Sequence, residues 1–66
     1  MKLIINGEQK EFEGNLTLGE VLRELELFDK VMAAAVNMEI VKQKEWDSHR
    51  MNNDDKLELL DFVGGG

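Results

Sequence analysis

The stretch TLGEVLREL, residues 17–25, predicts the one α-helix of this 66-residue chain. Thr17 and Glu20 form the capping-box pattern, in which each side chain accepts a hydrogen bond from the backbone N–H of the other residue. Gly19 costs about 1 kcal/mol relative to alanine inside a helix, so we expect it to mark a close approach to a strand. The apolar residues at helical spacing are Leu18, Val21, Leu22 and Leu25.

The residues before the helix predict a β-hairpin. Lys2–Ile5 is mostly aliphatic, and Asn6-Gly7 is the strongest two-residue turn signal between two strands. Alternation places Leu3 and Ile5 on one face of the first strand. Phe12 is the residue of the return strand that we expect to point inward.

The residues after the helix predict three further strands. VMAAAVNMEIV, residues 31–41, is expected to form two short strands around a turn, although its alanines leave a helix as an alternative. The polar, turn-rich segment that follows has Trp46 as its one large anchor. KLELLDFV, residues 56–63, is the last strand, with Leu57 and Leu59 on one face.

The expected order, β-β-α-β-β-β, predicts an α+β fold of the β-grasp, ubiquitin-like kind. Such a fold is a mixed sheet of four to five strands packed on one main helix, with the first and last strands parallel and adjacent in the centre. We expect residues 1–63 to form this domain and residues 64–66 to form a flexible C-terminal glycine tail. The expected core consists of Leu3, Ile5, Leu18, Val21, Leu22, Leu25, Val36, Leu57 and Leu59.

Composition excludes several functional classes. Because the chain has no cysteine, it has no disulfide scaffold, thiolate metal site or cysteine nucleophile. Its formal net charge of -6 disfavours nucleic acid and anionic membrane surfaces and favours a partner with a basic surface. No apolar run is long enough to span a membrane, and charged residues follow the start too soon for a signal peptide. We therefore expect a cytoplasmic location.

The sequence holds no catalytic constellation. His49 is the single histidine, and no second ligand lies at metal-site spacing from it. Asp47, Ser48 and His49 are adjacent in the chain, where they do not point at one another in triad geometry. We expect no metal or cofactor bound by this chain, and no enzymatic activity of the chain on its own.

The glycines Gly64, Gly65 and Gly66 remain as the functional candidates. Glycine has no Cβ, so such a segment is thin and adopts backbone angles that other residues avoid. Extended, three residues reach about 10 Å, which suits delivery into a narrow active-site channel. The reactive group is the α-carboxylate of Gly66, which needs a leaving group such as AMP before a nucleophile can attack it. The chain has no nucleotide-binding motif, so a partner must supply the activation.

Further features carry a family resemblance: VN-x-x-IV at residues 36–41, Trp46, D-x-L-x-LL at residues 55–60 and the terminal Gly-Gly. With the strand order, they make the whole chain resemble the sulfur carrier family of thiamine biosynthesis (ThiS). The glycine at position 64 departs from the family pattern and only lengthens the thin segment. The strand pattern is shared more loosely with the small subunit of molybdopterin synthase and with ubiquitin-like proteins.

The resemblance implies a sulfur carrier that serves partner enzymes. A ThiF-like adenylyltransferase, using ATP and magnesium, would adenylate the carboxylate of Gly66. Sulfur from a cysteine desulfurase or rhodanese relay would replace AMP and leave a terminal thiocarboxylate. Thiazole synthase (ThiG) would then take the sulfur for the thiazole of thiamine, with Gly64 and Gly65 threading the partner's channel.

A partner also needs a surface to hold, and the last strand offers one. If Leu57 faces the helix, alternation places Glu58, Leu60 and Phe62 together on the outer face of the sheet. Ile4 on the neighbouring strand would add to this exposed apolar patch, which favours partner binding. The predicted partner-binding residues are Ile4, Glu58, Leu60, Phe62 and Val63.

Other functions share these features. A molybdopterin-type sulfur carrier has the same C-terminus, although such chains are usually longer. A ubiquitin-like modifier would form amides with lysines instead, and a plain β-grasp interaction module would have no use for its glycines.

Overall fold

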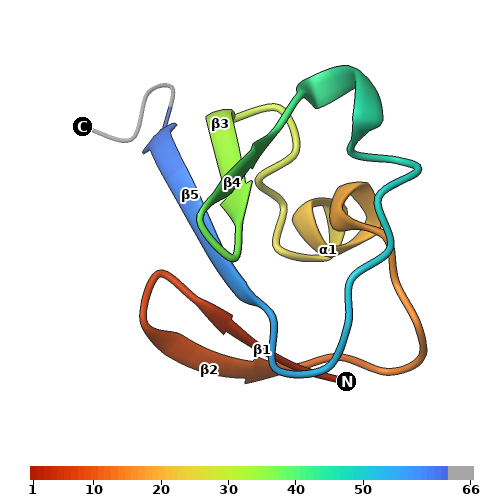
Figure 1. Ribbon diagram of the computed structural model, residues 1–66. Coiled ribbons are helices and arrows are strands. Elements are labelled where there is room, and N and C mark those ends of the chain that lie inside the picture. The colour runs from red at the N-terminus through yellow and green to blue at the C-terminus, as the bar shows by residue number, and fades with distance from the viewer. Residues whose placement is uncertain (63–66) are drawn as a thin grey trace.

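One five-stranded mixed sheet and one α-helix make up the part of the chain that the computed structural model describes (Figure 1). The model describes residues 1–62, and for residues 61 and 62 it describes the backbone alone. The domain boundary expected after residue 63 lies outside this part. The elements are β1 (Lys2–Ile5), β2 (Glu8–Glu11), α1 (Leu18–Glu24), β3 (Val31–Val36), β4 (Glu39–Val41), the 3-10 helix η1 (Gln43–Glu45) and β5 (Lys56–Phe62).

The sheet has the order β2-β1-β5-β3-β4. β5 lies in the middle, parallel to β1 and antiparallel to β3, with Ile5 opposite Leu57 and Ala34 opposite Leu59. α1 covers one face of the sheet (Figure 1). The predicted β-grasp arrangement is therefore confirmed, including the parallel central pair and the strand choice for residues 31–41.

The helix begins as its sequence predicts. The hydroxyl of Thr17 accepts a hydrogen bond from the Glu20 N–H at 3.1 Å, and the Glu20 carboxylate accepts one from the Thr17 N–H at 2.8 Å. Thr17 is the N-cap, and Leu18, Val21 and Leu22 are buried under the sheet. The capping box and the apolar stripe thus act together, one fixing where the helix begins and the other fixing which face is buried.

The helix ends in a Schellman motif with an unusual residue. The Leu27 N–H donates to the carbonyl of Leu22 at 2.8 Å, and the Glu26 N–H donates to that of Arg23 at 3.0 Å. This geometry requires a left-handed residue at Glu26, whose φ is 61°. Glycine is usual at this position because it has no Cβ to clash.

Gly19 does mark a close approach, but the predicted neighbour is wrong. A Cβ at position 19 would collide with the side chain of Asp47, in the loop after η1, and not with a strand. The same contact brings the Gly19 N–H within 2.8 Å of the Trp46 carbonyl. The glycine is needed because the loop passes directly over the first turn of the helix.

The predicted core is confirmed, with Leu25 only partly buried at its margin. Trp46, which is 1% exposed, extends the core, and its indole N–H donates to the carbonyl of Val41 at 2.8 Å. Phe12 also packs against the core, just past the end of β2. The other buried apolar residues that were not among those predicted for the core are Val31, Ala34, Ala35, Val41 and Met51.

The two hairpins turn in the same way with different residues. Asn6 and Gly7 have φ of 49° and 86°, and Asn37 and Met38 have φ of 50° and 74°. Two successive left-handed residues are the mark of a type I′ turn, for which Asn-Gly is the favoured pair. Met38 therefore occupies a position where a side chain costs roughly 1 kcal/mol in backbone strain.

Candidate functional site

The predicted reactive end of the chain follows β5. Val63, Gly64, Gly65 and Gly66 lie outside the described residues, as does the side chain of Phe62. The backbone that leads to them pairs with β3 alone, with Leu60 opposite Ala33 and Phe62 opposite Val31, because the pairing of β5 with β1 ends at Leu57.

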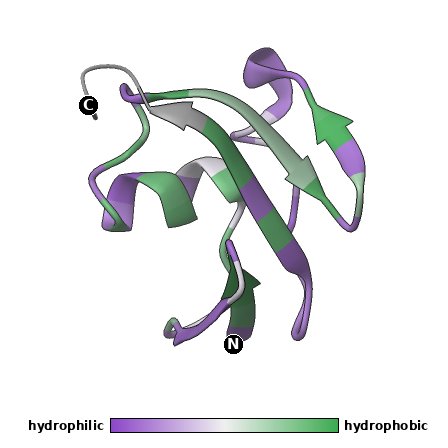
Figure 2. Ribbon diagram, turned by 90° about the vertical axis from the view of Figure 1, so that its left-hand side faces the viewer, coloured by the Kyte–Doolittle hydropathy of each residue, from purple (hydrophilic) through white to green (hydrophobic). Residues whose placement is uncertain are grey.

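β5 alternates between the core and the outer face of the sheet. Leu57 and Leu59 are buried, whereas Glu58 and Leu60 are exposed, Leu60 by 44%. In Figure 2, hydrophilic and hydrophobic bands alternate along the first part of the long central strand, and the part that follows is hydrophobic. The sequence-based assignment of Glu58 and Leu60 to the outer face is confirmed.

Ile4 shares the outer face with Leu60 but is not its neighbour. Ile4 is half-buried and lies opposite Lys56, four residues before Leu60 on β5. At about 3.3 Å per residue, the two positions are about 13 Å apart along the strand. Lys56 and Glu58 therefore lie between them, and the two residues do not form one continuous apolar patch.

Three exposed large apolar residues were missed from the sequence, namely Met32 in β3, Met38 and Ile40. Ile40 on β4 lies opposite Ala35, which itself lies opposite Glu58, so all three point to the outer face, and Ile40 is 63% exposed. Met38, in the turn before β4, is 85% exposed. Alternation in EIV could have found Ile40, because Val41 points inward and its neighbour must then point outward.

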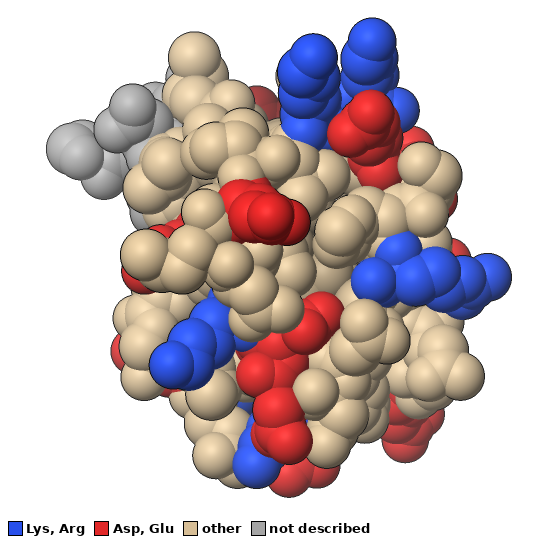
Figure 3. Space-filling model, viewed as in Figure 1, with Lys and Arg blue, Asp and Glu red and all other residues tan. Residues whose placement is uncertain are grey.

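The opposite edge of the sheet is polar throughout. β2 has the sequence EQKE, all four residues are exposed, and Lys10 pairs with Glu8 at 3.6 Å. On the outer face, β2 contributes Gln9 and Glu11, opposite Ile4 and Lys2, so this face is polar towards β2, whereas Ile40 makes it more apolar towards β4. On the face of the molecule shown in Figure 3, acidic and basic side chains are interspersed with uncharged ones.

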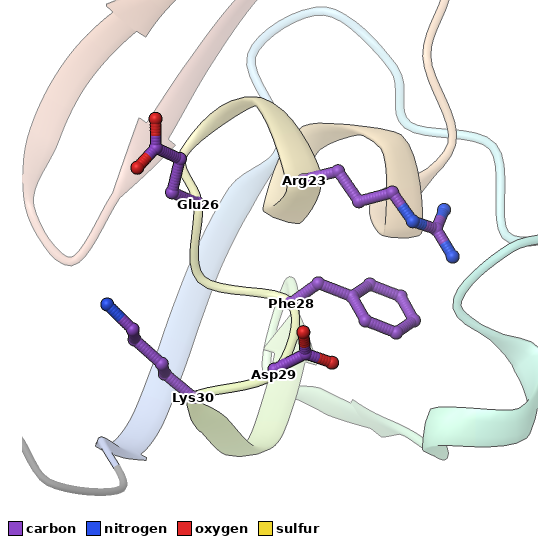
Figure 4. Close-up of a pocket in the computed structure, with 5 residues that line it drawn as sticks. All are labelled: Arg23, Glu26, Phe28, Asp29 and Lys30. Carbon is purple, nitrogen blue, oxygen red and sulfur yellow. The ribbon is translucent and has the colours of Figure 1, made fainter.

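A pocket of about 340 Å³ lies beside the end of α1 (Figure 4), lined by Arg23, Glu26, Phe28, Asp29 and Lys30. The Arg23 guanidinium lies 4.0 Å from the centre of the Phe28 ring, and that ring packs edge-on against Trp46 at 5.5 Å. Two hydrogen bonds, of 2.6 and 3.1 Å, hold Arg23 to the Asp47 carboxylate. This wall is a stack that covers the Trp46 indole, and it contains no nucleophile beside a base.

The hydrogen bond from Arg23 lowers the pKa of Asp47, and the same bond raises the pKa of Arg23. The Asp47 carboxylate therefore accepts its hydrogen bonds from Arg23. The Ser48 hydroxyl donates to the carbonyl of Glu45. Neither interaction orients His49 as a triad requires. Among the side chains that the structure describes, no three His, Cys, Asp or Glu residues are grouped to hold a metal ion.

No helix in the part of the chain that the structure describes is long and apolar enough to cross a bilayer.

Comparison with known proteins gives a consistent result. Residues 3–66 match the model of the ThiS family. The sulfur carrier protein ThiS of Escherichia coli (strain K12) is 26% identical over the full length of both chains. A crystal structure of the thiamine biosynthesis protein ThiS from Geobacter metallireducens superposes with a TM-score of 0.82 at 28% identity, covering all of both chains.

A longer relative is also similar over the whole of this chain. A thiazole synthase of Paramagnetospirillum magneticum is 39% identical over 66 residues, which are 100% of this chain and 20% of that protein. The chain thus spans a fifth of the length of this relative, so the remaining four-fifths have no counterpart here.

Proposed function

The chain belongs to the ThiS family, the sulfur carrier family of thiamine biosynthesis, and on that premise we propose that it carries sulfur as a thiocarboxylate on Gly66. The observation that carries the proposal is that the family match runs through the glycines to residue 66. The pairing of the end of β5 with β3 supports it, because this pairing gives the residues that follow a defined starting point in the sheet.

The chemistry requires an activating partner. A carboxylate resists nucleophilic attack because its negative charge is shared over two oxygens. In the proposed reaction, a carboxylate oxygen of Gly66 attacks the α-phosphorus of ATP and releases pyrophosphate, and sulfide then displaces AMP. A ThiF-like adenylyltransferase would hold the ATP and magnesium, and a cysteine desulfurase or rhodanese relay would deliver the sulfur.

The acceptor of the sulfur is proposed to be a thiazole synthase. One protein of that name includes a counterpart of this whole chain, which favours a direct partnership between the two parts. The exposed residues Glu58 and Leu60 lie on the strand that leads to the C-terminus, and they supply one surface for such partners. Phe62 and Val63 remain candidates for the same role, as Gly64 and Gly65 do for passage through a channel.

Intact-mass spectrometry tests the proposal. The purified chain is incubated with a ThiF-like adenylyltransferase, ATP, magnesium and sulfide. We expect the mass gain given by exchange of one oxygen for one sulfur, and we expect it to disappear when residues 64–66 are deleted, because deletion of Gly66 alone would leave another terminal Gly-Gly. A matched variant with one residue added after Gly66 separates a carrier from an inert β-grasp module, since only a carrier loses its modification. An unchanged wild-type mass, with no adenylate formed in the absence of sulfide, would contradict the proposal.

A further inference from the structure

The turns of both hairpins hold the last strand with an asparagine side chain. Asn6 donates its N–H to the carbonyl of Leu57 at 2.9 Å, and its side-chain oxygen Oδ1 accepts the N–H of Leu59 at 2.8 Å. On the other side of β5, Asn37 donates its N–H to the carbonyl of Lys56 at 2.8 Å, and its Oδ1 accepts the N–H of the same residue at 3.0 Å. In each turn a side-chain oxygen therefore takes the place of a main-chain carbonyl in the pairing with β5.

The two asparagines differ in what holds the amide nitrogen. Nδ2 of Asn37 donates to Oδ1 of Asp55 at 2.9 Å, and Asp55 is buried. The other carboxylate oxygen of Asp55 accepts the N–H of Asn52 at 2.7 Å. Among the described residues, the Asn6 side chain makes a single hydrogen bond, through its oxygen, so its amide nitrogen is free.

The residue that follows each asparagine also differs. Gly7 follows Asn6 with a φ of 86°, it is exposed, and a Cβ there would have no atom within 4 Å. Met38 follows Asn37 with a φ of 74°, and its side chain is 85% exposed, so it gains little from packing within the described residues. A side chain at such a left-handed position is strained. Position 38 therefore has a residue that the fold alone does not favour.

An asparagine that precedes an exposed glycine can react with the main chain itself. The main-chain nitrogen of Gly7 loses its proton to solvent and bonds to Cγ of Asn6, and the side-chain amide takes up a proton and leaves as ammonia. Water then opens the cyclic imide at either carbonyl, which gives aspartate or isoaspartate. Water is consumed and ammonia is released, with no oxidant or reductant. Glycine favours this attack because it has no Cβ beside the attacking nitrogen.

We propose that Asn6 is a site of deamidation by this route, and that Met38 protects Asn37 from the same reaction. At Asn6 the amide nitrogen is free and glycine follows, whereas at Asn37 the amide nitrogen is bonded to Asp55 and a residue with a side chain follows. Attack on Asn6 requires local opening of the turn, which two hydrogen bonds to β5 oppose. The strain at Met38 is explained, because glycine there would expose the amide that binds a buried carboxylate to the same attack.

The two sites would not suffer equally from the reaction. Aspartate at position 6 keeps an oxygen that accepts the Leu59 N–H, whereas isoaspartate adds a carbon to the main chain of the turn and breaks that hydrogen bond. Aspartate at position 37 removes the donor to Asp55 and places a second carboxyl group beside it. Loss of the partner of a buried acceptor is costly, so we expect the fold to tolerate aspartate at the first position and not at the second.

Aspartate variants measure this difference. Asn37→Asp should lower the melting temperature by about 4 °C or more, because a buried acceptor loses its donor. Asn6→Asp should stay within about 3 °C of the wild type. Equal losses in the two variants would contradict the roles assigned to the two side chains.

Peptide mapping after storage at mildly alkaline pH tests the site itself. Trypsin separates the two asparagines, because cleavage after lysine gives one peptide of residues 3–10 and another of residues 31–42. In the wild type we expect deamidation in the first peptide and not in the second, with fragment spectra that assign the change to Asn6 and not to Gln9. Isoaspartate methyltransferase then detects the isoaspartate product. An unchanged first peptide would overturn the proposal.

Two reciprocal variants test the role of the following residue. Gly7→Met gives the first turn the Asn-Met pair of the second and should abolish the change at Asn6. Met38→Gly gives the second turn the Asn-Gly pair of the first and should create a second site at Asn37, although the melting temperature before storage should rise by about 4 °C. Circular dichroism checks that both variants fold. A Met38→Gly protein with an unchanged second peptide would show that Met38 does not protect Asn37. Because no partner takes part, these results do not depend on the proposed function.

Discussion

At the scale of single residues, the contacts of Asp47 are those that the sequence predicts least. Its position next to Ser48 and His49 argues against a catalytic triad and indicates no other role, whereas the structure places its carboxylate on Arg23 and against Gly19. These contacts join the loop after η1 to the first turns of α1. Sequence patterns record spacing within an element, so a contact between residues 24 positions apart leaves no trace in them.

The Arg23–Asp47 pair predicts a pH dependence of stability. The hydrogen bond from Arg23 lowers the folded-state pKa of Asp47 below its ordinary value of 3.8. The contribution of the ionised carboxylate is therefore complete above pH 3.8 and is lost as the pH falls through the lower folded-state pKa. The difference in unfolding free energy between wild type and Asp47→Asn should be constant near neutrality and should shrink below pH 3.8.

Urea titrations at a series of pH values measure this difference. Glu13→Gln, at an exposed position, is the control for the general loss of negative charge. A difference for Asp47→Asn that grew on acidification would contradict the assigned pairing.

The individual elements follow from local signals wherever those signals are complete. The capping box at Thr17 and Glu20 and the turn at Asn6-Gly7 are each contained within a few residues, and both appear as predicted. The end of α1 is different, because Glu26 stands where glycine is usual. The helix stops there because Leu27 must turn back to pack under the sheet, which is a tertiary requirement that overrides local preference.

That helix end predicts a stabilising substitution. Glu26→Gly removes the Cβ strain of a left-handed residue at φ 61°, and the free energy of unfolding should rise by about 1 kcal/mol. Glu24→Gly, two residues earlier and inside the helix, should lower it by up to about 1 kcal/mol. Chemical denaturation of both variants measures the effects, and equal signs would show that the Schellman geometry does not control stability here.

At the scale of the whole molecule, the order of the strands in the sheet can be predicted from the pattern of elements. The arrangement of the predicted partner-binding residues on the outer face of the sheet cannot. Leu57 and Leu59 predict which face of β5 is buried, and this extends to Leu60 by alternation. The separation of Ile4 from Leu60 depends on the register of β1 against β5, which no local signal fixes. The predicted reactive group on Gly66 is beyond the described residues and stays a prediction.

We expect the domain to fold without residues 64–66 and the sulfur chemistry to require them, and this expectation has its own test. Deleting residues 64–66 should leave the unfolding free energy within about 0.5 kcal/mol of the wild type, as for changes away from the core. The same deletion should abolish thiocarboxylate formation. Thermal unfolding and intact mass, measured on one preparation, give both results, and a clear loss of stability would show that the glycines belong to the fold.

The central place of β5 has a consequence for how the protein is made. β1 pairs with β2 and β3 pairs with β4, but these two hairpins are joined in the sheet only through β5. A ribosome synthesises both hairpins and the helix before it synthesises the strand that unites them. A prematurely terminated product therefore has two unconnected half-sheets with open edges, which favours its removal by proteases. Only chains translated through β5 can complete the sheet, because β5 is the strand that joins the two hairpins.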